Sequence, residues 1–128
     1  MAHTSHVGIS ERDLDRSVAF YTTYFDFTVL KTFEKEIFQI KGAALEREDI
    51  DMEILQPYNP APKPKVAGPL ANYLRPLGAN HIALGVPDLP ALYERMKTDG
   101  VPLITEVMDG RTFFCADPDG TPIEVRKM

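Results

Sequence analysis

The sequence lacks the features of secreted, membrane and nucleic-acid-binding proteins. It has one cysteine, Cys115, so no disulfide can form within the chain, and the cytosol is the expected compartment. No apolar run approaches the roughly 20 residues that cross a bilayer, and charges interrupt the N-terminal region where a signal peptide needs an apolar segment. The formal net charge of −5 would repel phosphate backbones. We therefore expect a cytoplasmic protein that does not have nucleic acid or a membrane as its partner.

The composition that is present is that of a compact domain. Apolar residues make up 44% of the 128 residues and charged residues 26%, which is ordinary for a globular protein with a hydrophobic core. Prolines gather in one stretch and lack the N–H that a sheet interior requires, so we expect an exposed connector with one helical turn near residues 70–75. The predicted organisation is one domain, made of module 1–56, connector 57–79 and module 80–128.

The first module reads as a strand, a helix and a series of strands. Residues 6–10 alternate apolar with small or polar side chains, as a half-buried strand does. Next comes a helix with Asp13 as its N-cap, predicted because apolar residues recur at spacings of three and four. Those residues are Leu14, Val18, Tyr21 and Phe25. Strand candidates follow, ending in IDMEILQ.

The second module repeats this order. A strand at residues 81–86 precedes a helix for which Asp88 is the expected cap and Gly100 the expected end. Three strand candidates follow, VPLITEV, RTFFCAD and TPIEVRK, and the last two are joined by a turn at residues 117–120. Each half is therefore predicted to be β-α-β-β-β, and the fold class α+β.

The two halves place a histidine and a glutamate at equivalent points. His6 precedes Glu53 by 47 residues (53 − 6), and His81 precedes Glu124 by 43 (124 − 81). Strand alternation turns all four away from the apolar faces that must pack under the helices. Taken singly, such a histidine is more often structural and such a glutamate a solvated edge charge. Their repetition favours a shared function.

Two imidazoles and two carboxylates converge if the open faces of the two modules form one concave sheet. Neutral nitrogens with anionic oxygens suit a divalent ion such as Ni²⁺, Co²⁺, Mn²⁺, Zn²⁺ or Fe²⁺, with one or two positions open for water or substrate. We therefore predict a metal site made by His6, Glu53, His81 and Glu124. His3, near the N-terminus, is left out of this set.

At these positions the sequence resembles the vicinal oxygen chelate superfamily. This group includes glyoxalase I, methylmalonyl-CoA epimerase, extradiol dioxygenases, fosfomycin-resistance enzymes and bleomycin-binding proteins. The resemblance covers nearly the whole chain through HVGISERDLDRSVAFYTTYFDF, MEILQP, NHIALGVPDL and ADPDGTPIEV. It implies paired βαβββ modules that curl into a concave, metal-holding half-barrel, and a homodimer with the site built within one chain or across two. It also implies metal ligands most like those of bacterial glyoxalase I, at His6, Glu53, His81 and Glu124.

The resemblance also implies a chemistry. A metal that chelates two neighbouring oxygens of a small substrate stabilises the charge that develops when a proton next to a carbonyl leaves. A carboxylate takes and returns this proton, with Glu124 as the first candidate and Glu53 as the second. The implied protein is a lyase or isomerase of the glyoxalase or epimerase type. Two alternatives stay open: an extradiol ring-cleaving dioxygenase using Fe²⁺, and a non-catalytic binding protein of the bleomycin-resistance type.

Three departures from the family pattern bear on the substrate. Bacterial glyoxalases usually carry an arginine that grips glutathione four residues after the first histidine, where this chain has Ser10. They often carry an asparagine four residues after the first glutamate, where this chain has Pro57. We therefore predict that the protein does not work chiefly on the methylglyoxal–glutathione adduct and acts on another small substrate with neighbouring oxygens. Phe113 and Phe114 lie where extradiol dioxygenases have a tyrosine, so ring cleavage is the less favoured alternative.

Overall fold

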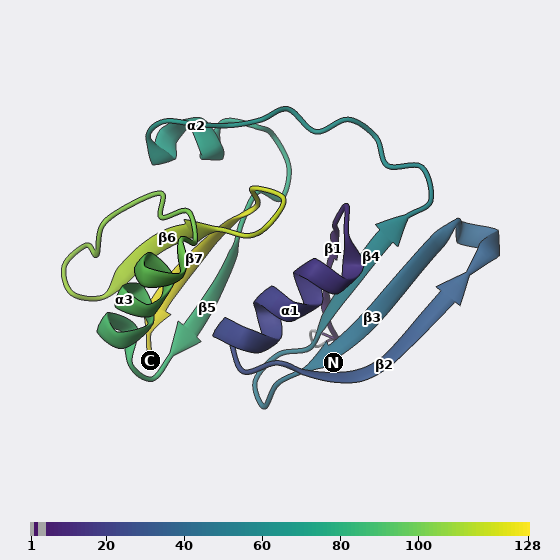
Figure 1. Ribbon diagram of the computed structural model, residues 1–128, viewed down its shortest axis with the longest axis horizontal. Coiled ribbons are helices and arrows are strands. Elements are labelled where there is room, and N and C mark those ends of the chain that lie inside the picture. The colour runs from purple at the N-terminus through teal and green to yellow at the C-terminus, as the bar shows by residue number, and fades with distance from the viewer. Residues whose placement is uncertain (1, 3–4) are drawn as a thin grey trace. The chain divides into compact units, whose positions relative to one another are not determined.

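The chain divides into two compact units, Met1–Pro62 and Lys63–Met128, each with one sheet (Figure 1). The structure is a computed structural model, and it describes residues 2 and 5–128. His3 lies outside the described residues. The boundary between the units falls inside the proline-rich connector. The predicted mixed α+β class is confirmed, since helices and sheets occur in both units.

The first unit has the predicted β-α-β-β-β order. Its sheet runs β1-β4-β3-β2, with β1 parallel to β4 and the other pairs antiparallel. Helix α1 lies against β2, β3 and β4. The elements are β1 (Val7–Ser10), α1 (Leu14–Tyr24), β2 (Thr28–Lys35), the 3₁₀ helix η1 (Glu36–Phe38), β3 (Ile40–Glu46) and β4 (Met52–Pro57).

Local rules fix where α1 begins and which face it buries. The Asp13 carboxylate accepts a hydrogen bond from the Arg16 N–H at 3.1 Å, as the predicted N-cap should. Aromatic rings fill the space between the helix and the sheet, with centroids 5.1 to 6.4 Å apart. The buried hydrophobic residues of this unit include Phe20, Tyr21, Phe25, Phe27, Ala43, Leu45, Met52 and Ile54.

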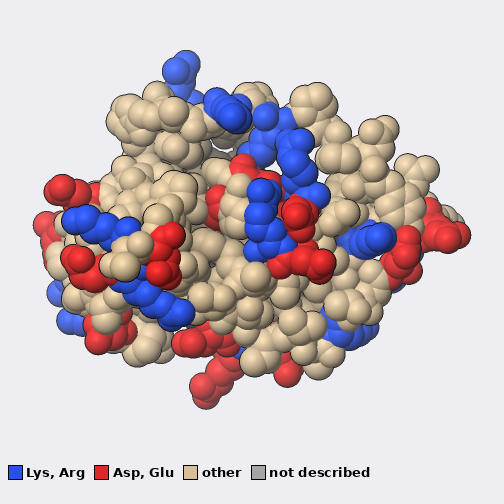
Figure 2. Space-filling model, viewed as in Figure 1, with Lys and Arg blue, Asp and Glu red and all other residues tan. Residues whose placement is uncertain are grey.

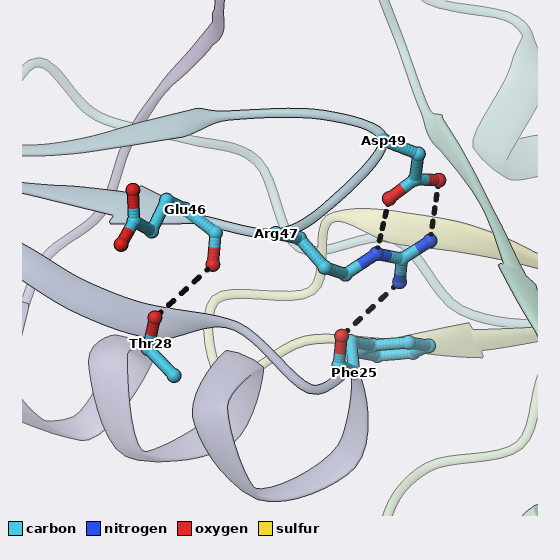
Figure 3. A network of polar contacts seen from close by, with 5 residues as sticks. All are labelled: Phe25, Thr28, Glu46, Arg47 and Asp49. Atoms are coloured by element: carbon cyan, nitrogen blue, oxygen red, sulfur yellow. Dashed lines mark hydrogen bonds and ion pairs between the residues drawn. The ribbon is translucent and has the colours of Figure 1, made fainter.

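A polar network joins the end of α1 to the loop between β3 and β4 (Figure 3). The Arg47 guanidinium donates to both carboxylate oxygens of Asp49, at 2.6 and 2.8 Å, and to the Phe25 carbonyl oxygen at 3.1 Å. It also lies 5.4 Å from the centre of the Phe27 ring. The hydrogen bond that Arg47 donates to Asp49 raises the pKa of Arg47 and lowers the pKa of Asp49. This contact holds the loop that leads into β4 against the aromatic core.

The second unit has a three-stranded sheet in the order β5-β7-β6. Asp88 caps α3 by accepting from the Ala91 N–H at 3.1 Å, and Gly100 ends it with a left-handed φ of 78°. Both predictions are confirmed, as is the short helix in the connector. The elements are α2 (Leu70–Leu74), β5 (Ile82–Val86), α3 (Leu89–Asp99), β6 (Thr112–Ala116) and β7 (Pro122–Lys127).

One predicted strand of this unit, VPLITEV at residues 101–107, does not form. Only an isolated bridge links Leu103 to Cys115. The ladder breaks because the N–H groups of Ile104 and Thr105 both donate to the Phe114 carbonyl, at 2.8 and 3.2 Å. The Phe114 N–H in turn donates to the Thr105 hydroxyl at 2.9 Å, in place of a backbone carbonyl. The threonine side chain thus replaces a ladder bond that a regular strand would make.

Neither unit contains, among the residues described, a helix long and apolar enough to span a membrane. Figure 2 shows acidic and basic side chains close to one another at several places on the face in view.

Candidate metal centre

The two units place their histidine and glutamate in the same strand register. In the first unit Gly8 of β1 pairs with Glu53 of β4, and His6 stands two residues before Gly8. In the second unit Ala83 of β5 pairs with Glu124 of β7, and His81 stands two residues before Ala83. Both strand pairs are parallel, so the histidine and the glutamate have the same relative position in the strand register of each sheet.

Burial follows the predicted alternation. Met52 and Ile54, on either side of Glu53, are buried, and so are Ile123 and Val125, on either side of Glu124. The small residues two positions after the histidines, Gly8 and Ala83, face outward, since both are exposed. Each glutamate therefore lies on the face of its sheet that is not packed against its own apolar core.

The second unit brings its pair into direct contact. His81 Nε2 lies 3.4 Å from Glu124 Oε1, and these side chains are 33% and 16% exposed. The ring of Phe114, which pairs with Glu124 across β6 and β7, lies 5.6 Å from the imidazole. Phe113 instead packs edge-on against Tyr93 of α3, with ring centroids 5.1 Å apart. The pair thus has an apolar wall on one side.

Two further residues, which the sequence analysis did not select, contact this pair. Asn80 Oδ1 lies 2.7 Å from His81 Nδ1, and Arg126 Nη1 donates to Glu124 Oε2 at 2.6 Å. The sequence did hold a signal for both. Asn80 is the neighbour of His81 along the chain, and Arg126 follows Glu124 by two residues, which puts it on the same strand face.

The contacts of His81 and Glu124 fit a divalent cation. Because Asn80 Oδ1 can only accept, a neutral His81 carries its proton on Nδ1, and the Nε2 lone pair then faces a carboxylate oxygen. A divalent cation between two such electron-rich atoms would be attracted to both. Metal–ligand distances of about 2.0–2.2 Å let donors up to about 4.2 Å apart share one ion. The observed 3.4 Å lies within this reach.

The first unit's pair has different neighbours. His6 is exposed, and its Nδ1 lies 3.5 Å from the Ser5 hydroxyl, at the limit of a hydrogen bond. The position equivalent to Arg126 is Leu55, two residues after Glu53. Each unit contains two of the four predicted ligands, and within the described part of the chain no group of three or more His, Cys, Asp or Glu residues is placed to hold a metal. The convergence of all four therefore stays a prediction.

Two α+β units with histidine–glutamate pairs in matching register define a protein built by repeating one module. The sequence profile of the Glyoxalase/Bleomycin resistance protein/Dioxygenase superfamily matches residues 3–125. This chain belongs to that superfamily, and the resemblance inferred from its motifs is confirmed.

Individual relatives agree with this assignment. Lactoylglutathione lyase from Haemophilus influenzae is 32% identical over 126 residues, which cover 93% of this chain and 87% of that protein. The trypanothione-dependent glyoxalase I from Leishmania major has a similar structure, with a TM-score of 0.79, 27% identity and coverage of 99% and 87% of the two chains. A fosfomycin-resistance protein FosX variant from Listeria monocytogenes, complexed with Mn(II) and a dihydroxypropylphosphonic acid, shares the fold at a TM-score of 0.69 and 20% identity, covering 99% and 93% of the two chains.

Proposed function

We propose that this protein is a divalent-metal-dependent lyase or isomerase of the glyoxalase or epimerase type. The observation that carries the proposal is the approach of His81 Nε2 to Glu124 Oε1 at 3.4 Å, together with the same strand register at His6 and Glu53. The similarity to lactoylglutathione lyase supports the same class of reaction. The proposed substrate is a small molecule with two neighbouring oxygens.

The four proposed ligands would supply two kinds of atom to the ion. His6 and His81 would supply neutral nitrogens, and Glu53 and Glu124 would supply anionic oxygens that balance its charge. The set suits Ni²⁺, Co²⁺, Mn²⁺, Zn²⁺ or Fe²⁺. When bound, such an ion supplies positive charge that stabilises the negative charge developing on the two substrate oxygens.

The protein's own contribution to the reaction is proton transfer. Glu124 is the first candidate to take the proton next to the substrate carbonyl, and Glu53 is the second. Return of that proton to the same carbon on its other face gives epimerisation, and return to the neighbouring carbon gives a glyoxalase-type isomerisation. The ring of Phe114, with its centre 5.6 Å from that of His81, would keep water from that side of the site.

The test is a substrate screen with protein loaded separately with each of the five metals. The panel contains 2-oxoaldehydes with and without glutathione, acyl-CoA thioesters, and catechols with an oxygen electrode. We expect turnover of a carbonyl substrate with deuterium from the solvent entering the carbon that loses its proton, and loss of turnover in His81→Ala. Oxygen uptake with a catechol would replace the proposal by the dioxygenase alternative. Tight binding of a bleomycin-type drug with no turnover on the panel would replace it by the binding protein.

A further inference from the structure

We infer that Asn80 and Arg126 are positioning residues that make His81 and Glu124 the anchoring half of the metal site. The inference rests on the proposed function, because it concerns how the proposed ion is held. It assigns a role to two residues outside the four ligands, and it makes the two units unequal.

The first step concerns the imidazole of His81. An isolated neutral histidine prefers to carry its proton on Nε2, which would leave no lone pair there for a metal. The Asn80 carbonyl oxygen, 2.7 Å from Nδ1, reverses this preference because it accepts a hydrogen bond from an Nδ1–H group. Asn80 therefore prepares Nε2 as a ligand and fixes the plane of the ring before any ion arrives.

The second step concerns the carboxylate of Glu124. Arg126 Nη1 donates to Oε2 at 2.6 Å, and Oε1 is left facing His81. A charge-assisted bond of this length favours the orientation of the carboxylate in which Oε1 is left for the ion before any substrate binds. Arg126 is itself 60% exposed, so its contribution is orientation of Glu124 and not burial.

The third step is the comparison with the first unit, where the strand register is the same but the residues next to the histidine and the glutamate are different. Ser5 stands where the second unit has Asn80, and its hydroxyl is 3.5 Å from His6 Nδ1. Leu55 stands where the second unit has Arg126, and it offers no donor to Glu53. The contacts made by Asn80 and Arg126 are therefore not a requirement of the fold. They act on His81 and Glu124 alone, and this pair binds the ion first and most tightly.

The role of Asn80 is tested on metal-free protein by nitrogen-15 NMR of the histidine rings, at a pH where His81 is neutral. We expect the Nδ1–H tautomer in the native protein and a shift toward Nε2–H in Asn80→Ala. Asn80→Asp, which keeps the acceptor, should restore the Nδ1–H tautomer. An Nε2–H tautomer in the native protein, or an unchanged tautomer in Asn80→Ala, would overturn the inference.

The anchoring role is tested by titration with Co²⁺. Loss of a residue that orients a ligand weakens metal binding by about 10- to 100-fold, and we expect this for Asn80→Ala and for Arg126→Leu. Ser5→Ala and Lys127→Leu are the matched controls, one at the equivalent position of the first unit and one beside Arg126, and both should bind Co²⁺ as the native protein does. Equal affinities in all four variants, or a loss in Ser5→Ala as large as in Asn80→Ala, would show that the second unit is not the anchor.

Failure of the proposed function has a different signature. If the native protein binds Co²⁺ but turns over no substrate, the proposed reaction is wrong and the two positioning roles stand. If the native protein binds none of the five metals, the proposed function and the anchoring role both fall, and the tautomer measurement still decides whether Asn80 orients His81.

Discussion

His81 Nε2 lies 3.4 Å from Glu124 Oε1 although 43 positions (124 − 81) separate these residues in the chain. The contact exists because β5 and β7, the first and last strands of the second unit, are parallel neighbours. The hairpin of β6 and β7 returns the chain to β5 and places the glutamate beside the start of that strand. An imidazole nitrogen and a carboxylate oxygen are thereby held close together, as two ligands of the proposed ion would be. The predictions below test this site and the fold around it.

Replacing either histidine by alanine should remove most of the bound metal, because each supplies one nitrogen of the proposed four-ligand set. The native protein should hold one divalent ion per two-module site. His6 is exposed and His81 lies just before its strand, so the circular dichroism spectrum should not change. Elemental analysis after purification measures the effect, with His3→Ala as the control. A full metal complement in both His6→Ala and His81→Ala would show that the ligand assignment is wrong.

Introducing arginine at Ser10 should improve use of the methylglyoxal–glutathione adduct. Ser10 is exposed on β1, on the same strand face as Gly8, which pairs with Glu53. One charge-assisted hydrogen bond contributes roughly 1.5–3 kcal/mol, so Ser10→Arg should raise kcat/KM for the adduct by about one to two decades. Ser10→Gln, which adds a polar but uncharged side chain, is the control. A native kcat/KM of about 10⁶ M⁻¹s⁻¹ or more would show instead that another cation already grips this substrate.

The buried thiol of Cys115 should make the protein less stable in alkali. Burial, with a smaller effect from the charge of Asp117, raises the pKa of Cys115 from its ordinary 9.0 to about 12. Between these values the unfolded chain releases the thiol proton and the folded chain keeps it, so the free energy of unfolding falls by about 1.4 kcal/mol per pH unit. Denaturant unfolding from pH 8 upward should show a steeper fall for the native protein than for Cys115→Ala. If the free energy of unfolding fell equally with pH in both proteins, the Cys115 thiol would not be the cause.

Removing the Arg47 side chain should destabilise the first unit. Arg47→Met takes away the donor to the Phe25 carbonyl as well as the ion pair, and we expect a loss of about 1–3 kcal/mol in urea unfolding. Asp49→Asn removes only the partially exposed ion pair and should cost about 0.2–1 kcal/mol. Because Arg47 lowers the pKa of Asp49, the contribution of the pair is present at neutral pH and disappears as the pH falls below 3.8. Equal losses in the two variants would show that neither the bond to Phe25 nor the contact with the Phe27 ring contributes to stability.

The resemblance to the superfamily implies a homodimer. Light scattering at micromolar concentration should then return about twice the chain mass of 14.4 kDa. The reason is an analogy of fold and not a contact within this chain. A mass equal to that of one chain would reject the dimer, and the site would then have to be completed within a single chain.

Much of the fold could be predicted because its causes are local. Asp13, Asp88 and Gly100 cap the helices through bonds that reach only a few residues along the chain. The alternation of apolar and polar residues assigned the four candidate ligands to the open strand faces, since strand periodicity depends on the backbone alone. The motifs that surround the repeated histidine and glutamate carry the resemblance to the superfamily, which is confirmed.

Tertiary structure decided what depends on which strands become neighbours. The failure of residues 101–107 to form a strand results from the Thr105 hydroxyl taking the Phe114 N–H, a contact across nine positions that no pattern of apolar residues encodes. The 3.4 Å approach of His81 to Glu124 requires the parallel pairing of β5 with β7. The proposed roles of Asn80 and Arg126 also depend on that pairing, because it brings His81 and Glu124 together. The helix ends and the strand faces of the candidate ligands follow from local chemistry. The distances between those ligands, and the residues that contact them, follow from contacts between segments far apart in sequence.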